Sequence, residues 1–153
     1  PVPFHQDLLF VIAEWIKAQP RLQPEYRMLQ DEDVLLPGTE NYLRPDIAVY
    51  RPAEVDMNSV PFRALPPPEA EVLSPSTAGY DWGDKKAAYA EAGVSEYWIA
   101  DPASCSLAVL IKPERGEYTQ VHADSEGMVR SSFFGCRAKL EFDGHDYHLR
   151  SST

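Results

Sequence analysis

The stretch that decides the fold runs from Glu71 to Asp101, EVLSPSTAGYDWGDKKAAYAEAGVSEYWIAD. Glu71–Leu73 predicts a short strand, and the serine-, proline- and glycine-rich segment after it is typical of a loop. Asp81–Ala92 predicts a helix with Gly93 as its natural end, because glycine favours the backbone conformation that follows a helix. Glu96–Ala100 predicts a second strand. Ionisable residues stand where these elements meet, which makes them candidates for a functional site.

Composition predicts one soluble domain over residues 1–153, because 44% of the residues are hydrophobic and 25% are charged. No apolar run approaches the roughly 20 residues that span a bilayer, and no secretory signal pattern is present. Cys105 and Cys136 match no zinc or redox spacing, so we expect reduced, structural thiols in a cytoplasmic protein. The chain starts at Pro1 without a methionine, which leaves open a segment before it.

The formal net charge of -10 argues against a generic nucleic-acid binder, which usually has a basic surface. It does not exclude one. A metal site lined by carboxylates adds negative charge itself, and a local basic strip can coexist with an acidic remainder.

Several elements flank the central stretch. His5–Gln19 predicts an amphipathic helix, and Arg21–Gln30 predicts a strand with loose alternation. Leu43–Tyr50, LRPDIAVY, predicts a stronger strand. Ala53–Pro68 predicts a loop because prolines interrupt it, and its length is unusual for a connection without structure. From Ser106 onward, alternating segments and turn residues predict antiparallel hairpins.

Asp46 is the first candidate site residue. Ile47 and Val49 share one face of the predicted strand, so Asp46 and Ala48 point the other way. A carboxylate at the start of a strand is also a common turn former. The position alone therefore leaves a structural and a functional interpretation open.

Lys85 is the second candidate, on the predicted helix. Asp81, Lys85 and Tyr89 share a helix face at four-residue spacing. The simplest interpretation is a surface ion pair between Asp81 and Lys85, worth about 0.3–0.5 kcal/mol. Small alanines beside Tyr89 predict instead that this face packs closely on a sheet, with Lys85 directed toward the neighbouring strand ends.

The combination of Asp46, Glu71 and Lys85 favours hydrolytic chemistry. Two carboxylates on two strands supply hard oxygen ligands for Mg²⁺ or Mn²⁺. Without a cation between them they would repel each other. A nearby ammonium group holds an attacking water or offsets the charge on a phosphate, which are the parts that phosphodiester hydrolysis needs.

A series of motifs in this order resembles the Uma family, restriction-endonuclease-like proteins of the PD-(D/E)XK nuclease superfamily. The resemblance is close over residues 43 to 102. It rests on Pro45-Asp46-Ile47-Ala48-Val49, Glu71-Val72-Leu73-Ser74-Pro75-Ser76-Thr77, Asp81 with Lys85 and Tyr89, Gly93-Val94, Glu96-Tyr97-Trp98 and Asp101-Pro102.

The resemblance implies an α/β (α+β) fold, with a restriction-endonuclease-like mixed central sheet, flanking helices and C-terminal antiparallel hairpins. It implies Asp46 and Glu71 as metal ligands, with the Val72 backbone carbonyl as a third. The superfamily usually places a lysine where Leu73 stands here. The family takes its lysine from the following helix, at the position that matches Lys85.

We therefore expect a Mg²⁺- or Mn²⁺-dependent endonuclease acting on DNA, with Asp81 and Tyr89 supporting the site. The alternative is a nuclease-derived binding or regulatory module without turnover, which the acidic charge favours. By analogy with restriction enzymes, the hairpins after Ser106 are a candidate interface for a homodimer.

Overall fold

The computed structural model describes residues 3–22, 25–30, 34–35, 42–43, 46–52, 55–56, 62–64, 70–73 and 84–153. Its helices are α1 (Pro3–Lys17), α3 (Asp84–Ala92) and the short 3₁₀ helix η1 (Pro20–Leu22). Its strands are β1 (Arg27–Gln30), β2 (Val34–Leu35), β3 (Tyr42–Leu43), β4 (Ile47–Tyr50), β5 (Val55–Asp56), β6 (Phe62–Ala64), β7 (Ala70–Leu73), β8 (Glu96–Asp101), β9 (Ser106–Glu114), β10 (Glu117–Gln120), β11 (Val129–Ser131), β12 (Cys136–Phe142) and β13 (Tyr147–Ser152). None of the helices in these ranges is long and apolar enough to cross a membrane.

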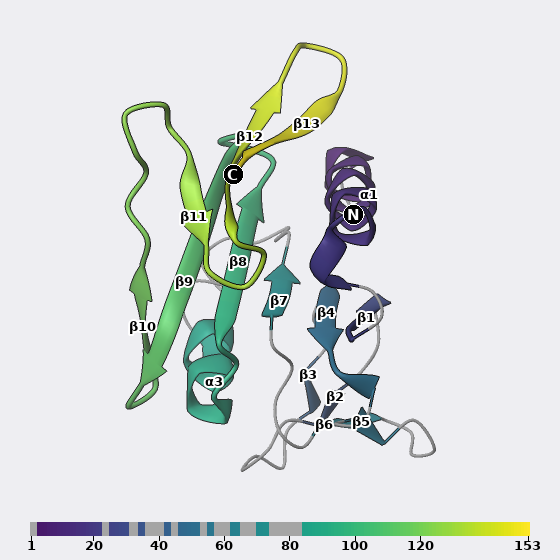
Figure 1. Ribbon diagram of the computed structural model, residues 1–153, viewed down its shortest axis with the longest axis vertical. Coiled ribbons are helices and arrows are strands. Elements are labelled where there is room, and N and C mark those ends of the chain that lie inside the picture. Colours follow the sequence, from purple (N-terminus) through teal and green to yellow (C-terminus); the bar gives the residue numbers. More distant parts are fainter. Residues whose placement is uncertain are drawn as a thin grey trace.

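A mixed sheet with the strand order β1-β4-β7-β8-β9-β10 forms the centre of the described fold (Figure 1). Its β7 and β8 are parallel, and α3 lies between them in the chain, as the crossover between parallel strands requires. The other neighbours in this sheet are antiparallel. A second, antiparallel sheet has the order β11-β12-β13, and short strands form a third in the order β3-β2-β6-β5. The predicted α+β fold, with a mixed central sheet and C-terminal hairpins, is confirmed.

One face of the central sheet packs against α1, and we call it the α1 face. Leu8, Ile12 and Ile16 recur every fourth residue of α1 and are fully buried. Burying such a side chain contributes about 1.5–3 kcal/mol, so this stripe anchors the helix. The stripe packs with residues from the central and C-terminal strands: Ile47, Val49, Trp98, Ala100, Val109, Val129, Phe133, Leu140 and Tyr147.

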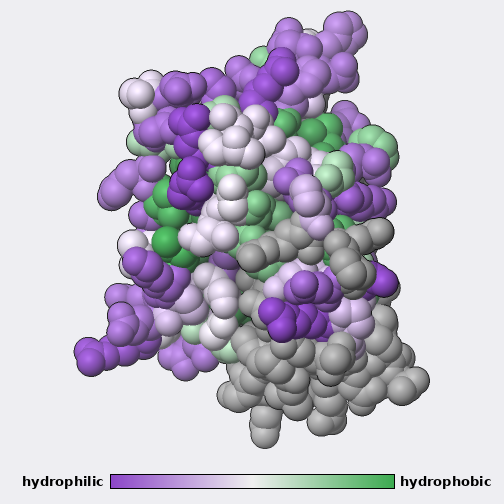
Figure 2. All heavy atoms as spheres, in the orientation of Figure 1, coloured by the Kyte–Doolittle hydropathy of each residue, from purple (hydrophilic) through white to green (hydrophobic). Residues whose placement is uncertain are grey.

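The opposite face packs against α3, and we call it the α3 face. Its buried cluster joins Tyr89, Ala92 and Val94, in and after the helix, to Tyr50, Tyr97, Ile99, Ala108 and Leu110 of the sheet. All four residues of β4 are buried, because both faces of this strand are covered. In the view of Figure 1, the described residues that reach the surface are mostly hydrophilic, with hydrophobic atoms showing in places (Figure 2).

The ends of the elements follow local sequence signals. α1 ends before Pro20, which lacks an amide hydrogen and breaks the helical ladder. α3 ends at Gly93, whose φ is +82°, and the Val94 amide donates to the Tyr89 carbonyl at 3.1 Å. Arg115 and Gly116 both have positive φ and form the tight turn between β9 and β10.

Two expectations from the sequence are corrected. Ala53–Pro68 is predicted as a loop, but β5 and β6 lie within it and pair with each other. Strands of two or three residues are too short to show alternation in the sequence. The strand predicted over Arg21–Gln30 is shorter, because η1 occupies its first part and β1 begins only at Arg27.

Candidate functional site

Asp46 stands immediately before β4, and its side chain is half-buried. Ile47 and Val49 belong to the α1-face core, whereas Tyr50 belongs to the α3-face core. Side chains alternate along a strand, so Ala48 shares the α3 face with Tyr50. Asp46 precedes Ala48 by two residues, so the same alternation assigns it to the α3 face as well.

Glu71 lies inside β7, between β4 and β8. Its Cα partners are Ala48 on β4 and Tyr97 on β8. Directly paired residues of neighbouring strands lie on the same face, so position 71 belongs to the α3 face with Tyr97. Asp46 precedes Ala48 by two residues, which makes it a diagonal neighbour of Glu71 at about 7–8 Å in a regular antiparallel pair. Val72 is the next residue of the strand, and both its side chain and that of Glu71 lie outside the described residues.

α3 covers the face on which position 71 lies. Tyr89 is fully buried, and its ring centroid is 5.0 Å from that of Tyr97, the residue paired with Glu71. Position 85 precedes Tyr89 by one helical turn and so lies on the same side of α3. The side chain of Lys85 and the whole of Asp81 lie outside the described residues. The structure therefore brings the positions of Asp46, Glu71, Lys85 and Tyr89 to one face of the sheet.

Several tyrosines pack on the α3 face, close to the positions of the candidate site residues. Tyr97 stacks on Tyr118 of β10 with a centroid distance of 5.7 Å and an interplanar angle of 12°. The Tyr118 hydroxyl donates to the Val94 carbonyl at 2.6 Å, which ties β10 to the segment after α3. Burial raises the pKa of Tyr50, partly offset by Arg27, so this phenol adds no negative charge at neutral pH. The sequence pattern assigned no role to Tyr97 or Tyr118.

Residues 1–141 match the family model Uma2, which is described as a putative restriction endonuclease. The chain belongs to the Uma2 family. The match extends well beyond the motifs between residues 43 and 102 and confirms the predicted family.

A solved structure shows that the Uma2 chain shares its fold with a protein titled a putative nuclease belonging to DUF820, from Anabaena variabilis ATCC 29413. The TM-score is 0.65 at 18% sequence identity, and the alignment covers 88% of this chain and 75% of that chain. At this identity the likeness concerns the fold alone. A search of curated proteins finds no significant match.

The donor set of the Uma2 chain fits a divalent cation. Asp46 and Glu71 offer carboxylate oxygens and Val72 a backbone carbonyl oxygen, the ligand types that Mg²⁺ and Mn²⁺ prefer. Among the side chains that the structure describes, no group of three histidine, cysteine, aspartate or glutamate residues could hold a metal. Within this part of the chain, His145 and His148 belong to no such group. Both are surface residues, and His148 contacts Asp143.

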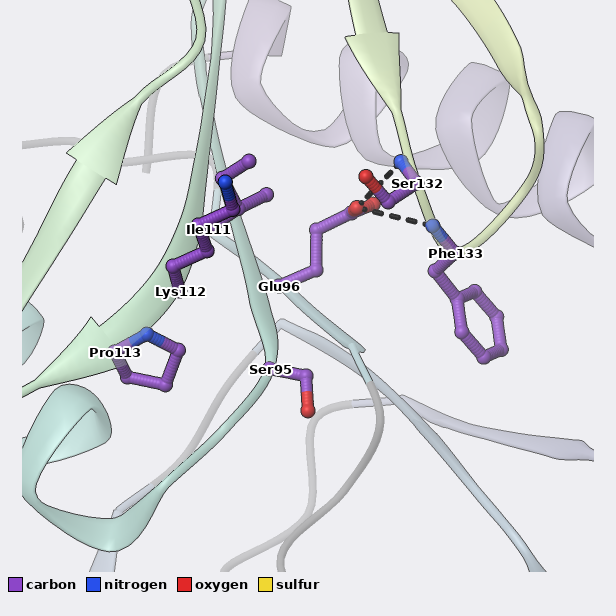
Figure 3. Close-up of a pocket in the computed structure, with 7 residues that line it drawn as sticks. All are labelled: Ser95, Glu96, Ile111, Lys112, Pro113, Ser132 and Phe133. Carbon is purple, nitrogen blue, oxygen red and sulfur yellow. Dashed lines mark hydrogen bonds between the residues drawn. The ribbon is translucent and has the colours of Figure 1, made fainter.

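Glu96 forms a polar contact that the sequence did not reveal (Figure 3). It lies at the start of β8 and is only 2% exposed. Its Oε1 accepts hydrogen bonds from the backbone amides of Ser132 and Phe133, at 3.0 and 3.1 Å. Its Oε2 accepts from the Ser131 hydroxyl at 2.6 Å and from the Trp98 indole at 2.8 Å. These donors lie on the α1 face, so Glu96 fastens the β11–β12 turn to the central sheet.

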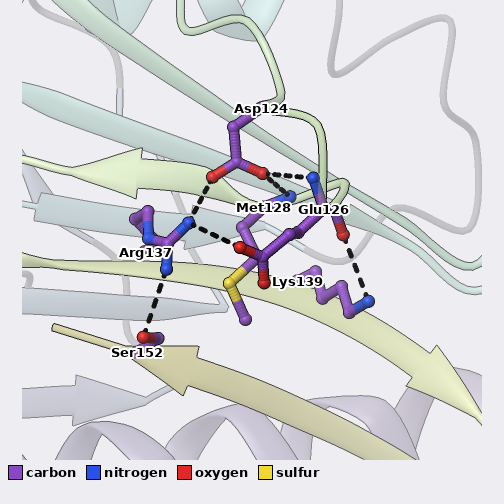
Figure 4. A network of polar contacts seen from close by, with 6 residues as sticks. All are labelled: Asp124, Glu126, Met128, Arg137, Lys139 and Ser152. Atoms are coloured by element: carbon purple, nitrogen blue, oxygen red, sulfur yellow. Dashed lines mark hydrogen bonds and ion pairs between the residues drawn. The ribbon is translucent and has the colours of Figure 1, made fainter.

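A second polar network fixes the segment between β10 and β11 (Figure 4). Asp124 accepts hydrogen bonds from the backbone amides of Glu126 and Met128, at 2.9 and 3.0 Å. It also accepts from the Arg137 guanidinium at 2.6 Å, and this contact holds the pKa of Asp124 below its usual value. Arg137 reaches Ser152 of β13 at 3.2 Å. The acidic groups of this network are engaged by donors within the protein. We therefore interpret the network as a structural feature of the surface.

Proposed function

We propose that this Uma2-family protein is a Mg²⁺- or Mn²⁺-dependent nuclease that hydrolyses phosphodiester bonds in DNA. The observation that supports the proposal is the register of β7. It sets Glu71 diagonally across from Asp46, on the face that α3 covers. Carboxylates brought together from these two positions would repel each other, and a cation between them would relieve that repulsion.

Each candidate residue has a distinct part in this proposal. Asp46 and Glu71 hold the cation with their carboxylates, and Val72 adds its backbone carbonyl. When bound, the ion polarises a phosphoryl oxygen and lowers the pKa of water. Lys85 orients the attacking water or offsets charge developing on the phosphate. Asp81 and Tyr89 support the position of Lys85, Tyr89 through its packing on Tyr97.

One observation favours a second function. The net charge of -10 opposes tight binding of a polyanion. A nuclease-derived module that binds a partner without cleaving nucleic acid would tolerate this charge. Turnover distinguishes the two functions.

The central experiment is a cleavage assay on single-stranded, duplex and branched DNA over a range of Mg²⁺ and Mn²⁺ concentrations. Lys85→Ala is compared with Lys86→Ala, because consecutive positions of a helix lie on different sides of it. We expect Lys85→Ala to lower the rate by about 10²–10³-fold, the usual effect of removing one group that stabilises transition-state charge. Lys86→Ala should cleave nearly as the wild type does.

Metal binding by titration calorimetry accompanies the assay. Glu71→Ala should weaken Mn²⁺ binding by at least about 100-fold, since even residues that only support metal ligands cost about 10–100-fold. Glu117→Gln on exposed β10 is the matched control. Equal Mn²⁺ affinity in wild type and Glu71→Ala would refute the site. Metal binding without cleavage would favour the binding module, and equal cleavage by wild type and Lys85→Ala would indicate a contaminating nuclease.

A further inference from the structure

Two large hydrophobic side chains are exposed in the described part of the chain, Phe10 at 67% and Phe142 at 42%. They are far apart in sequence, Phe10 on α1 and Phe142 at the end of β12, yet they line the same groove. We call it the Phe groove. Its volume of about 360 Å³ falls in the range of about 300–1,000 Å³ typical of pockets that receive a ligand.

The floor of the Phe groove is fixed by packing. Val11 of α1 and Tyr147 of β13 line it together with the two phenylalanines. The rings of Phe142 and Tyr147 lie 4.9 Å apart, and the Tyr147 hydroxyl donates to the Pro102 carbonyl at 3.2 Å. α1 and the β12–β13 hairpin lie beside each other, and hydrophobic atoms reach the surface below the hydrophilic hairpin (Figures 1 and 2). The groove is thus preformed, which lowers the entropic cost of filling it.

The rim of the Phe groove is acidic. Asp7 and Asp146 both line it, together with His145, and neither carboxylate makes a salt bridge with any residue in the described ranges. Burial raises the pKa of Tyr147, and the charges of Cys105, Asp101 and Asp7 add to the shift.

We propose that the Phe groove docks a segment of another protein that carries an apolar anchor side chain flanked by lysine or arginine. The apolar side chain would fill the space between Phe10 and Phe142, and the basic residues would meet Asp7 and Asp146. The rim excludes two other occupants by charge. A second copy would bring the same carboxylates to the contact in a chain of net charge -10, and nucleic acid would bring phosphates.

The position of the groove makes such docking compatible with the proposed nuclease. α1 packs on the α1 face, whereas Asp46 and Glu71 are assigned to the opposite face. A partner in the groove leaves the α3 face open. The inference does not depend on catalysis and survives if cleavage is never observed.

The test uses the whole chain and a fluorescent peptide with a central Leu-Phe pair between lysines. One control peptide replaces the lysines with glutamates, and another replaces Leu-Phe with serines. Binding is measured by fluorescence polarisation and mapped by amide chemical-shift changes. We expect only the first peptide to bind and to shift resonances of α1 and the β12–β13 hairpin.

Substitutions in the Phe groove show which side chains contribute to peptide binding. Phe10→Gln and Phe142→Thr should each weaken binding by about tenfold, as removal of an interface anchor does. Asp7→Asn with Asp146→Asn should weaken it about threefold and reduce its salt dependence, whereas Glu117→Gln should leave it unchanged. Equal binding of the glutamate peptide, or unchanged binding to Phe10→Gln, would overturn the proposal. So would sedimentation of the wild type as a dimer that Phe10→Gln dissociates, because a second copy would then be the occupant.

Discussion

On the α1 face of β8, the Glu96 carboxylate is buried and accepts hydrogen bonds from four donors within the chain, whereas its neighbour Tyr97 faces α3 among other tyrosines. Glu71, which pairs with Tyr97, is the candidate acid of that second face. In the proposed site, the same residue type would serve a second purpose on the same sheet. A carboxylate fully satisfied by protein donors holds structure together, while a carboxylate set beside another acid calls for a cation.

The largest expected effect tests the structural side of this comparison. Glu96→Ala leaves the Trp98 indole, the Ser131 hydroxyl and two backbone amides without their acceptor on the α1 face. Buried donors without partners are costly, so we expect the free energy of unfolding to fall by about 3 kcal/mol. Urea denaturation followed by tryptophan fluorescence measures this loss.

Mn²⁺ titration of the same variant provides its control. Below its unfolding midpoint, Glu96→Ala should bind Mn²⁺ as the wild type does, because the candidate metal site lies on the other face. Loss of metal binding with unchanged stability would reverse the roles assigned to Glu96 and Glu71.

A smaller effect is expected on the α3 face. Tyr118→Phe keeps the stacking on Tyr97 but removes the hydrogen bond to the Val94 carbonyl. One hydrogen bond contributes about 1 kcal/mol, so unfolding should become easier by about that amount. Hydrogen exchange of the β10 amides measures it. An unchanged exchange rate would mean that the hydrogen bond to Val94 adds nothing measurable to the stability of β10.

The smallest expected effect is the loss of stability at low pH that arises from Asp143 in the β12–β13 hairpin. Backbone amides of Asp146 and His145 and the His148 ring lower the pKa of Asp143 to about 2. A lowered carboxyl pKa contributes stability that is full above the unfolded value of about 3.9 and is lost as the pH falls toward 2. The difference in unfolding free energy between wild type and Asp143→Asn should therefore shrink between pH 4 and 2. A difference that stays constant over this range would contradict the assigned contacts.

Much of the fold is predictable from local patterns. Helical spacing in α1, the glycine after α3 and the turns of the C-terminal hairpins each determine structure through residues near in sequence. β5 and β6 were missed because their pairing, rather than any periodic pattern, makes them strands. The burial of both faces of β4 could not be predicted from the sequence either, since an alternating pattern indicates one covered face and not two.

The candidate site, too, could be predicted only in part from local sequence patterns. The sequence indicated Asp46, Glu71 and Lys85 through their places on two strands and a helix, and these assignments remain proposals. The register that sets Glu71 opposite Ala48 and Tyr97 arises from pairing across the sheet, which no local pattern encodes. The structural role of Glu96 was not predicted, because its partners Ser131, Ser132 and Phe133 lie 35–37 residues away.

The contact of α1 with β13 has a consequence for the order of folding. Trp15 donates from its indole to the Ser151 hydroxyl at 3.2 Å, across 136 residues of chain, and the stripe of α1 packs on Leu140 and Tyr147. During synthesis this helix leaves the ribosome long before those strands exist. Part of its apolar surface waits uncovered until they arrive, so a nascent chain is exposed to aggregation for most of its synthesis. Contacts of such long range also predict slow refolding.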